Sequence, residues 1–299
     1  MQGIKRRIHS VTSIEHITSA MKLVSAAKLR RARNIYERVE GNLHFVTDSI
    51  NDIIGSVSDA PSSYMAGSRE IKRTCYVVVT SNRGLAGSFN ANVIKEAERL
   101  MRDDVEKPLL VCIGSKGRDY FRKRDYEILS EHLGAPEDVT FEEMSLITKD
   151  VVSLYDEGAI DELIFVYMAY ISTMEQRPVS EKLLPFDKIN AGANEEADET
   201  KKEADSEQID REVEHLVDYE PSAEAVFSYL VPKYAEIMLY HTVVESAICE
   251  HAARRMAMQN ATDNAREMMT SLNLFYNRAR QAAITSEITE IVSGAEQVK

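Results

Sequence analysis

The sequence predicts a mixed α/β fold in which long helices from both ends form an antiparallel coiled coil, joined to a small central α/β domain. Two observations lead to this prediction. Apolar residues near each end repeat at steps of three and four, the spacing of a coiled-coil seam. Between the ends, short apolar runs rich in β-branched residues alternate with helical or polar stretches. That alternation is typical of a mostly parallel sheet covered by helices.

The N-terminal region, residues 1–58, is predicted to be one long helix. No Gly or Pro occurs between Ile4 and Glu40, which permits about 55 Å of helix. A helix with one apolar stripe is marginally stable alone in water, so we expect it to pair with a partner helix. The stripe comprises Ile4, Ile8, Val11, Ile14, Ile17, Met21 and Val24.

The central region, residues 70–193, is predicted to be a Rossmann-like α/β domain. Its strand candidates are the continuous apolar runs 74–79, 109–113 and 163–171, each separated from the next by helical or polar sequence. The run that follows, 194–214, is strongly acidic and has no apolar periodicity. Such a composition lacks the apolar surface to join a core, so it is predicted to be a linker or insert.

The C-terminal region, residues 221–295, is predicted to be the second arm of the coiled coil. Between Lys233 and Ser293 there is neither Gly nor Pro, so a continuous helix there would be about 90 Å long. Its expected seam is Ala261, Ala265, Met268, Leu272, Phe275 and Ala279. This arm is longer than its partner, so its last turns are expected to extend beyond the pair.

Composition excludes several classes of protein. A net charge of −13 and a pI near 5.1 argue against a general nucleic-acid binder, which needs a basic surface. No apolar run approaches the length needed to cross a bilayer. The three Cys lie far apart without a CxxC pair, so they are predicted to be buried thiols. The acidity is local, because residues 1–40 hold nine Lys or Arg against three Glu.

Two glycine-containing turns follow predicted strands, at 81–90 and 114–117. Neither matches the spacing of a dinucleotide-binding or phosphate-binding loop, so structural turns are the favoured interpretation. The seven His are dispersed, and no nucleophile motif occurs. The sequence therefore predicts no catalytic residue, no metal site and no cofactor.

Four segments near the two ends of the chain form recognisable motifs: IKRRI at 4–8, ITSAMKLVSAAK at 17–28, RRMAMQNATDNA at 254–265 and YNRARQAAITSEITEIVSGA at 276–295. Together they resemble the gamma subunit of F-type ATP synthases. In the centre, residues 81–90 resemble a family loop, with Asn82 and Ala86 in place of its Asp and Cys. The likeness covers both arms and the central domain and leaves out the acidic insert.

The resemblance implies a non-catalytic central rotor shaft of the synthase. Its coiled coil would lie inside a hexamer of alpha and beta subunits, and its α/β domain would stand on a membrane ring of c subunits, with the epsilon subunit as a further partner. Flow of H⁺ or Na⁺ would turn ring and shaft together and drive ATP synthesis at the beta subunits. The implied location is peripheral, on the cytoplasmic face of the bacterial cell membrane.

The same resemblance implies contacts with the beta subunits. The matching positions are Met21, Lys28 and Arg31 in the N-terminal arm and Arg254, Gln281, Thr285 and Glu287 in the C-terminal arm. Arg255 adjoins Arg254 and is an alternative to it. The basic run 28–33, taken alone, is either a solvated helix face or a contact with an acidic partner.

Two other functions remain open at this point. One is a nucleotide-binding α/β protein that uses residues 81–90 as its phosphate loop, with helical arms for oligomerisation. The other is a coiled-coil scaffold unrelated to ATP synthesis.

Overall fold

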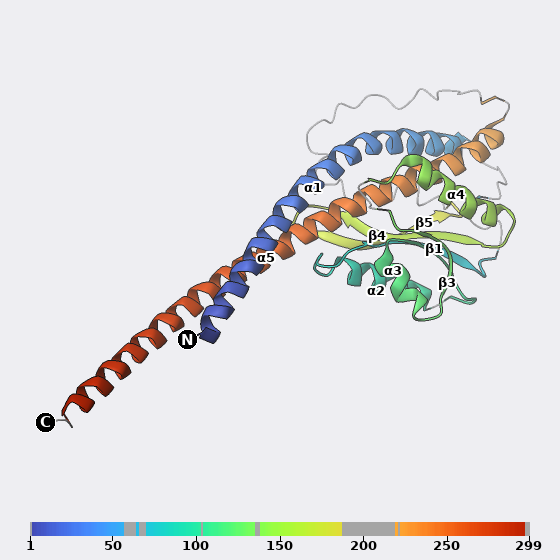
Figure 1. The fold of residues 1–299 in the computed structure, drawn as a ribbon. Helices are drawn as coiled ribbons and strands as arrows, with labels where there is room; N and C mark the ends of the chain where they lie inside the picture. Colours follow the sequence, from blue (N-terminus) through green and yellow to red (C-terminus); the bar gives the residue numbers. More distant parts are fainter. Residues whose placement is uncertain are drawn as a thin grey trace. The chain divides into compact units, whose positions relative to one another are not determined.

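The computed structural model describes residues 2–56, 64–65, 70–102, 104–134, 138–186, 219–220 and 222–296 (Figure 1). The acidic run 194–214 lies outside the described residues. The elements in chain order are α1 (Gln2–Ser56), β1 (Thr74–Val79), α2 (Phe89–Met101), β2 (Leu109–Ile113), α3 (Ser115–Arg122), β3 (Glu127–His132), α4 (Phe141–Asp156), β4 (Glu162–Tyr170), β5 (Gln176–Leu184) and α5 (Ala223–Glu296).

The chain forms two compact units, and both long helices contribute to each. The coil unit consists of Met1–Lys28, Leu85–Gly87 and His251–Lys299. The sheet unit consists of Leu29–Gly84 and Ser88–Glu250.

The sheet unit contains a five-stranded sheet in the order β3-β2-β1-β4-β5. The first four strands are parallel and β5 is antiparallel to β4, which confirms the prediction of a mostly parallel sheet. Helices α2 and α3 pack on one face. Helix α4 and the segments of α1 and α5 that belong to this unit cover the other face, where alternate strand residues such as Val77, Val111 and Phe165 form the main core (Figure 1).

Strands β3 and β5 were not among the sequence predictions. Both lie at the edges of the sheet, and their residues alternate between exposed and partly buried positions or carry several charges. The continuous apolar runs that marked β1, β2 and β4 arise because those strands are covered on both faces. An edge strand lacks that signal, so a search for apolar runs misses it.

The coil unit is an antiparallel pair of helices, as predicted. Thr12 of α1 lies 3.3 Å from the sulfur of Met269, Glu15 is paired with Arg266, and Thr18 with Thr262. Residue numbers rise on one helix as they fall on the other, and this order defines the antiparallel register. Extending the register places the start of α1 near residue 280, and all residues from 281 to 290 of α5 are exposed.

The seam of the coiled coil differs from the predicted one. On α5 the covered positions of the coil unit step by four and three, and comprise Met258, Thr262, Ala265, Met269, Leu272, Tyr276 and Ala279. Met268 and Phe275, which were predicted to lie in the seam, are 54% and 59% exposed. Each is one position away from a seam residue, Met269 and Tyr276, which are also apolar or aromatic. The sequence pattern alone did not distinguish the two neighbours.

The same error affects α1. Its covered positions form an unbroken heptad pattern along the helix, and in the coil unit they are Ile4, Ile8, Val11, Glu15, Thr18, Lys22 and Ser25. The predicted seam residues Ile14, Ile17 and Val24 each expose half or more of their surface. The pattern continues in the sheet unit through Leu29, Ala32, Tyr36, Val39, Leu43, Val46, Ile50 and Ile53.

The revised seam can be tested with two neighbouring aromatic residues of α5. Tyr276→Ala should lower the free energy of unfolding of the isolated chain by about 1–2 kcal/mol more than Phe275→Ala, because only Tyr276 loses packing in the seam. Urea unfolding followed by circular dichroism measures both values. A larger loss for Phe275→Ala would restore the seam predicted from the sequence.

Candidate partner-contact surface

Polar side chains hold the middle of the coiled-coil seam. The hydroxyl groups of Thr18 and Thr262 lie 2.8 Å apart, and Thr262 is fully buried. Nε and Nη2 of Arg266 donate to Oε1 of Glu15 at 3.0 and 2.9 Å. Hydrogen bonds need matched partners, whereas apolar contacts do not, so these pairs define the register of the two helices.

The apolar residues left out of the seam form an outward stripe on α1. Ile14, Ile17 and Val24 are exposed, and Met21 between them is half-buried. Their spacing of three and four places them on one side of the helix. Met268 and Phe275, seven residues apart on α5, form a second exposed apolar pair. Grouped apolar side chains on a surface mark a site of contact with a partner.

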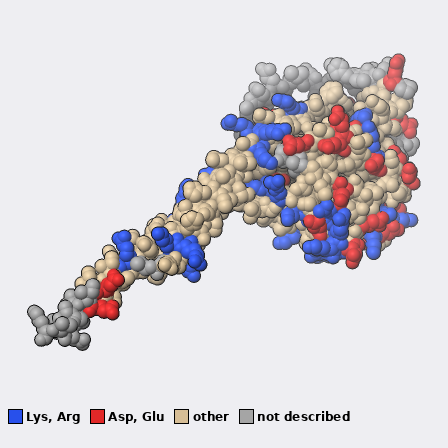
Figure 2. Space-filling model, in the orientation of Figure 1, with Lys and Arg blue, Asp and Glu red and all other residues tan. Residues whose placement is uncertain are grey.

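The coil unit is cationic although the whole chain is acidic. Residues 2–28 and 251–290 together hold ten Lys or Arg against five Asp or Glu, while the full chain carries a net charge of −13. Figure 2 shows Lys and Arg on this unit, with acidic side chains near the end of α5. The unit would therefore attract a partner with acidic groups.

The predicted contact residues of the N-terminal arm lie on α1. Met21 and Lys28 are half-buried in the coil unit. Arg31, in the sheet unit, is exposed and its Nη2 lies 3.2 Å from Asp138 Oδ1. Both partners of this pair are largely exposed, and an exposed ion pair contributes little to stability. Arg31 could therefore exchange Asp138 for a carboxylate of a partner at small cost.

The two adjoining arginines of the C-terminal arm have different environments. Arg254 is 9% exposed, and its Nη1 lies 3.4 Å from Nδ1 of His251. Arg255 is exposed. An outward contact at this level of α5 is therefore available to Arg255, the alternative named from the sequence, whereas Arg254 contributes to packing within the chain.

The remaining predicted contact residues lie on the part of α5 that extends past the first residue of α1. Gln281, Thr285 and Glu287 are all exposed. The hydroxyl of Thr285 donates to the carbonyl of Gln281 at 2.9 Å, so these two residues lie one turn apart on one side. Glu287 is two residues further, which is about 200° around the helix. This segment thus presents polar groups on opposite sides.

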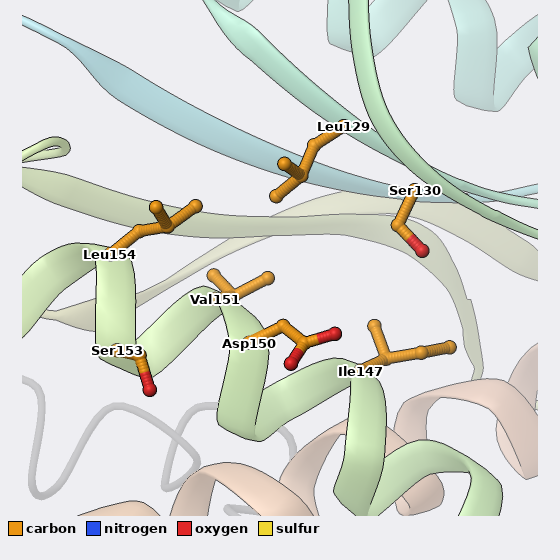
Figure 3. Close-up of a pocket in the computed structure, with 7 residues that line it drawn as sticks. All are labelled: Leu129, Ser130, Ile147, Asp150, Val151, Ser153 and Leu154. Carbon is orange, nitrogen blue, oxygen red and sulfur yellow. The ribbon is translucent and has the colours of Figure 1, made fainter.

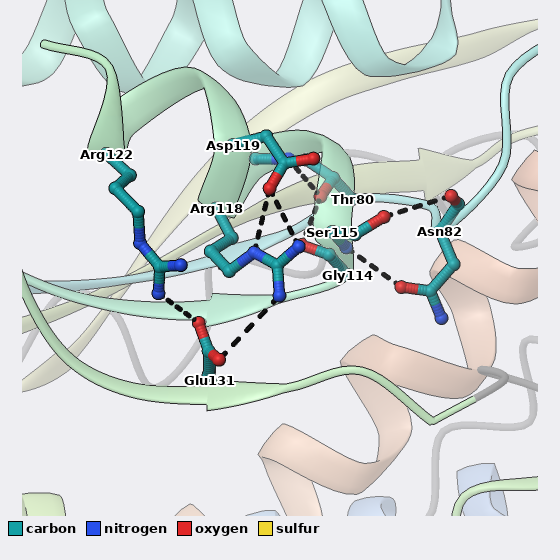
Figure 4. A network of polar contacts seen from close by, with 9 residues as sticks. Thr80, Asn82, Gly114, Ser115, Arg118, Asp119, Arg122 and Glu131 are labelled. Carbon is teal, nitrogen blue, oxygen red and sulfur yellow. Dashed lines mark hydrogen bonds and ion pairs between the residues drawn. The ribbon is translucent and has the colours of Figure 1, made fainter.

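In the turn before α3, the backbone donors that could bind a phosphate group are bonded to the chain itself (Figure 4). A phosphate group would bind the free N–H groups of the first turn of a helix. In α3 the N–H of Ser115 donates to Asn82 Oδ1 at 2.8 Å, that of Lys116 to the Ser81 carbonyl at 3.1 Å, and that of Gly117 to Thr80 Oγ1 at 2.9 Å. The chain itself occupies these donors.

The two arginines of α3 are also engaged elsewhere. Arg122 pairs with Glu131 at 2.7 Å, and Arg118 pairs with Asp119 at 2.7 Å and with Glu131 at 3.7 Å (Figure 4). They belong to ion pairs on the surface of the sheet unit. The turn at 114–117 is therefore a structural connection, which disfavours a phosphate site before α3.

A hollow between β3 and α4 offers no catalytic arrangement (Figure 3). Its lining is mainly aliphatic with one carboxylate and two hydroxyl groups, and comprises Leu129, Ser130, Ile147, Asp150, Val151, Ser153 and Leu154. A carboxylate and hydroxyl groups without a His to serve as base do not form a hydrolytic site of the usual kind.

Within the ranges that the structure describes, no helix is long and apolar enough to cross a membrane.

Gly114 provides a test of the occupied turn. Its φ is +94°, and a Cβ there would overlap the Thr80 carbonyl and lie 2.9 Å from Thr80 Oγ1. Gly114→Ala should lower the free energy of unfolding by about 2 kcal/mol or more, through backbone strain and displacement of Thr80. Gly84→Ala is the matched control, because a Cβ there meets nothing within 4 Å. Equal stability of the two variants would show that the turn is looser than described.

Comparisons with known proteins agree on one family. The ATP synthase family profile matches residues 1–298. The ATP synthase gamma chain of Alkaliphilus metalliredigens is 44% identical over all of this chain and 99% of its own length. The sodium ion specific gamma chain of Acetobacterium woodii is 42% identical over 99% of this chain and 98% of its own.

The fold also resembles that of a chain in a solved ATP synthase structure. A chain in the Euglena gracilis mitochondrial ATP synthase structure (OSCP/F1/c-ring, rotational state 3) matches with a TM-score of 0.68 and 18% identity, covering 99% of this chain and 94% of that one. The whole length of the chain is matched both in sequence and in fold, including the two helical arms whose residues first indicated the resemblance. The chain belongs to the ATP synthase gamma-chain family.

Proposed function

We propose that this chain is the central stalk of an ATP synthase, which rotates inside a hexamer of alpha and beta subunits. Flow of H⁺ or Na⁺ across the membrane would turn it and so drive ATP synthesis at the beta subunits. The observation that carries the proposal is the coil unit, with its internal polar seam and its cationic, partly apolar outer surface. The chain itself is a non-catalytic subunit, in keeping with the occupied turn before α3.

The surface of the coil unit suits a rotating part. An axle must contact its housing at every angle without a large dry interface that fixes one position. The outward stripe of Ile14, Ile17 and Val24 is short, and the end of α5 presents polar groups on opposite sides. Two helices of unequal length also make an asymmetric rod, so each of the beta subunits would meet a different surface.

The proposed contacts with the beta subunits fall in two groups. Met21, Lys28 and Arg31 would face acidic loops of beta, where the basic surface of the coil unit gives electrostatic attraction. Gln281, Thr285 and Glu287 would contact a loop of beta at the exposed end of α5, with Arg254 or Arg255 below them. The c-subunit ring and the epsilon subunit would bind the sheet unit, at the cytoplasmic face of the bacterial membrane.

Torque transmission gives the test of the proposal. Leu272→Gly should lower ATP synthesis against an ion gradient more than unloaded ATP hydrolysis in reconstituted vesicles, because a loosened seam twists under load. The substitution removes helix propensity worth about 1 kcal/mol together with seam packing worth about 2 kcal/mol or more. Both rates are measured in the same vesicles after assembly has been verified.

The matched control for this test is Leu274→Gly, which removes the same helix propensity at an exposed position. It should change the ratio of synthesis to hydrolysis little. An equal loss of both activities in Leu272→Gly would contradict the role of the seam in transmitting torque.

The purified chain alone should hydrolyse no ATP. Turnover by the chain alone would contradict a non-catalytic subunit.

Substitutions of Arg254 and of Arg255 should have different effects, the first on the stability of the chain and the second on its contact with a partner. Arg254→Ala should lower the free energy of unfolding of the isolated chain by about 1–2 kcal/mol, because its buried guanidinium has partners within the chain. Arg255→Ala should leave that stability within about 0.5 kcal/mol and lower the ATPase rate of assembled hexamers. Urea unfolding and steady-state hydrolysis measure the two effects, and a reversed pattern would assign the contact to Arg254.

A further inference from the structure

On the side that faces β1, the end of strand β4 is hydrogen-bonded to a helix instead of a strand. The last register pair between β1 and β4 joins Val78 to Val166, so β4 continues past its neighbour. The next N–H groups on that side, of Met168 and Tyr170, donate to Ser246 Oγ at 3.4 Å and to Glu245 Oε1 at 2.8 Å. Helix α5 thus supplies the acceptors that another strand residue would supply.

Glu245 makes this bond from a dry, acidic layer of the sheet unit. Its side chain is buried, with 6% of the residue exposed. No Lys or Arg within the described ranges forms an ion pair with it. The titratable groups that face the layer are Tyr36, Glu40 and His44 from α1, Tyr167 and Tyr170 from β4, Glu181 from β5, and His241 and Cys249 from α5.

Burial and neighbouring carboxyl groups make ionisation of Glu245 unfavourable. Burial is the largest cause that raises its pKa to about 7, with further contributions from Glu181 and Glu40, while the N–H of Tyr170 acts in the opposite direction. Desolvation at a partly buried position likewise raises the pKa of Glu181, although the Tyr167 hydroxyl donates to it at 3.0 Å.

His241 places an unpartnered ring nitrogen opposite the carboxyl group of Glu245. Burial and then His44 lower the pKa of His241 to about 4, so the ring is neutral near neutral pH. Its Nδ1 lies 3.9 Å from Glu245 Oε2 and has no hydrogen-bond partner in the described part of the chain. The ring also contacts Tyr36 of α1, with ring centroids 4.9 Å apart.

We propose that Glu245 is a proton-operated latch between helix α5 and the end of strand β4. The neutral carboxyl accepts from the Tyr170 N–H through Oε1 and directs its proton from Oε2 towards His241. Loss of that proton leaves a charge at a buried position near two other, partly buried carboxyl groups. The charged side chain then moves towards water, and the bond to Tyr170 opens. The inference concerns the sheet unit and does not depend on the rotary role.

The direction of the pH effect follows from the raised pKa of Glu245. In the unfolded chain the group has an ordinary pKa near 4.5, so the folded state binds the proton more tightly. Its stabilising contribution is complete below that value and is lost as the pH rises towards about 7. Alkaline conditions therefore loosen the attachment of α5 to β4.

Two measurements on the full-length chain test the latch. Protection of the Tyr170 amide against hydrogen exchange, corrected for the intrinsic rate and divided by that of Val77, should fall between about pH 6 and pH 8. In Glu245→Gln, which keeps the Oε1 acceptor but cannot ionise, this ratio should stay constant. The unfolding equilibrium constant of the natural chain relative to Glu245→Gln should rise by up to about tenfold per pH unit between about pH 5 and pH 7.

The matched control is Glu224→Gln, at an exposed position in the first turn of α5, which should leave the pH profile of the natural chain unchanged. If Glu245→Gln does not fold, Glu181→Gln takes its place. Removing that neighbouring carboxyl should move the loss of Tyr170 protection to lower pH. A pH-independent ratio in the natural chain, or parallel pH profiles for the natural chain and Glu245→Gln, would overturn the proposal.

Discussion

The heptad repeat of α1 is the constraint on which the rest of the structure depends. Covered residues recur at steps of four and three from Ile4 to Ile53 without an insertion. In the coil unit this seam is mixed, with three aliphatic residues followed by four polar ones. In the sheet unit it becomes apolar and joins the core with Ala247 and Ile248 of α5. One repeat therefore serves as a hydrogen-bonded seam in one unit and as part of a core in the other.

The sequence predicted the elements with strong, continuous signals. Both arms, the three inner strands and their parallel arrangement follow from apolar runs and from the absence of Gly and Pro. The phase of the seam was wrong because Ile14 and Phe275 are more apolar than their seam neighbours Glu15 and Tyr276. Hydrophobicity alone cannot distinguish a residue that faces its partner helix from one that faces another protein, since both are apolar and share the same periodicity.

For the contact residues, too, the sequence predicted the region of the helix but not which side chain faces outward. A motif places Arg254 and Arg255 at one level of the helix, yet adjacent positions differ by about 100° in direction. Only the register with other elements decides that Arg254 is buried and Arg255 exposed. The occupied turn before α3 was also beyond prediction in detail, because Thr80 and Asn82 precede α3 by more than thirty residues and meet it through the sheet.

The hydrogen bonds from β4 to α5 also define how the helix is oriented about its own axis. Ser246 and Glu245 are neighbours in sequence, and both must face the strand end for Met168 and Tyr170 to be satisfied. Rotating the helix about its axis by the angle of one residue would move one acceptor away and leave a backbone N–H of β4 without a hydrogen-bond partner. Apolar packing tolerates such a rotation more readily. The pair therefore couples the helix to the sheet in this unit, so that a rotation of the helix about its axis is transmitted to the strand with little slippage.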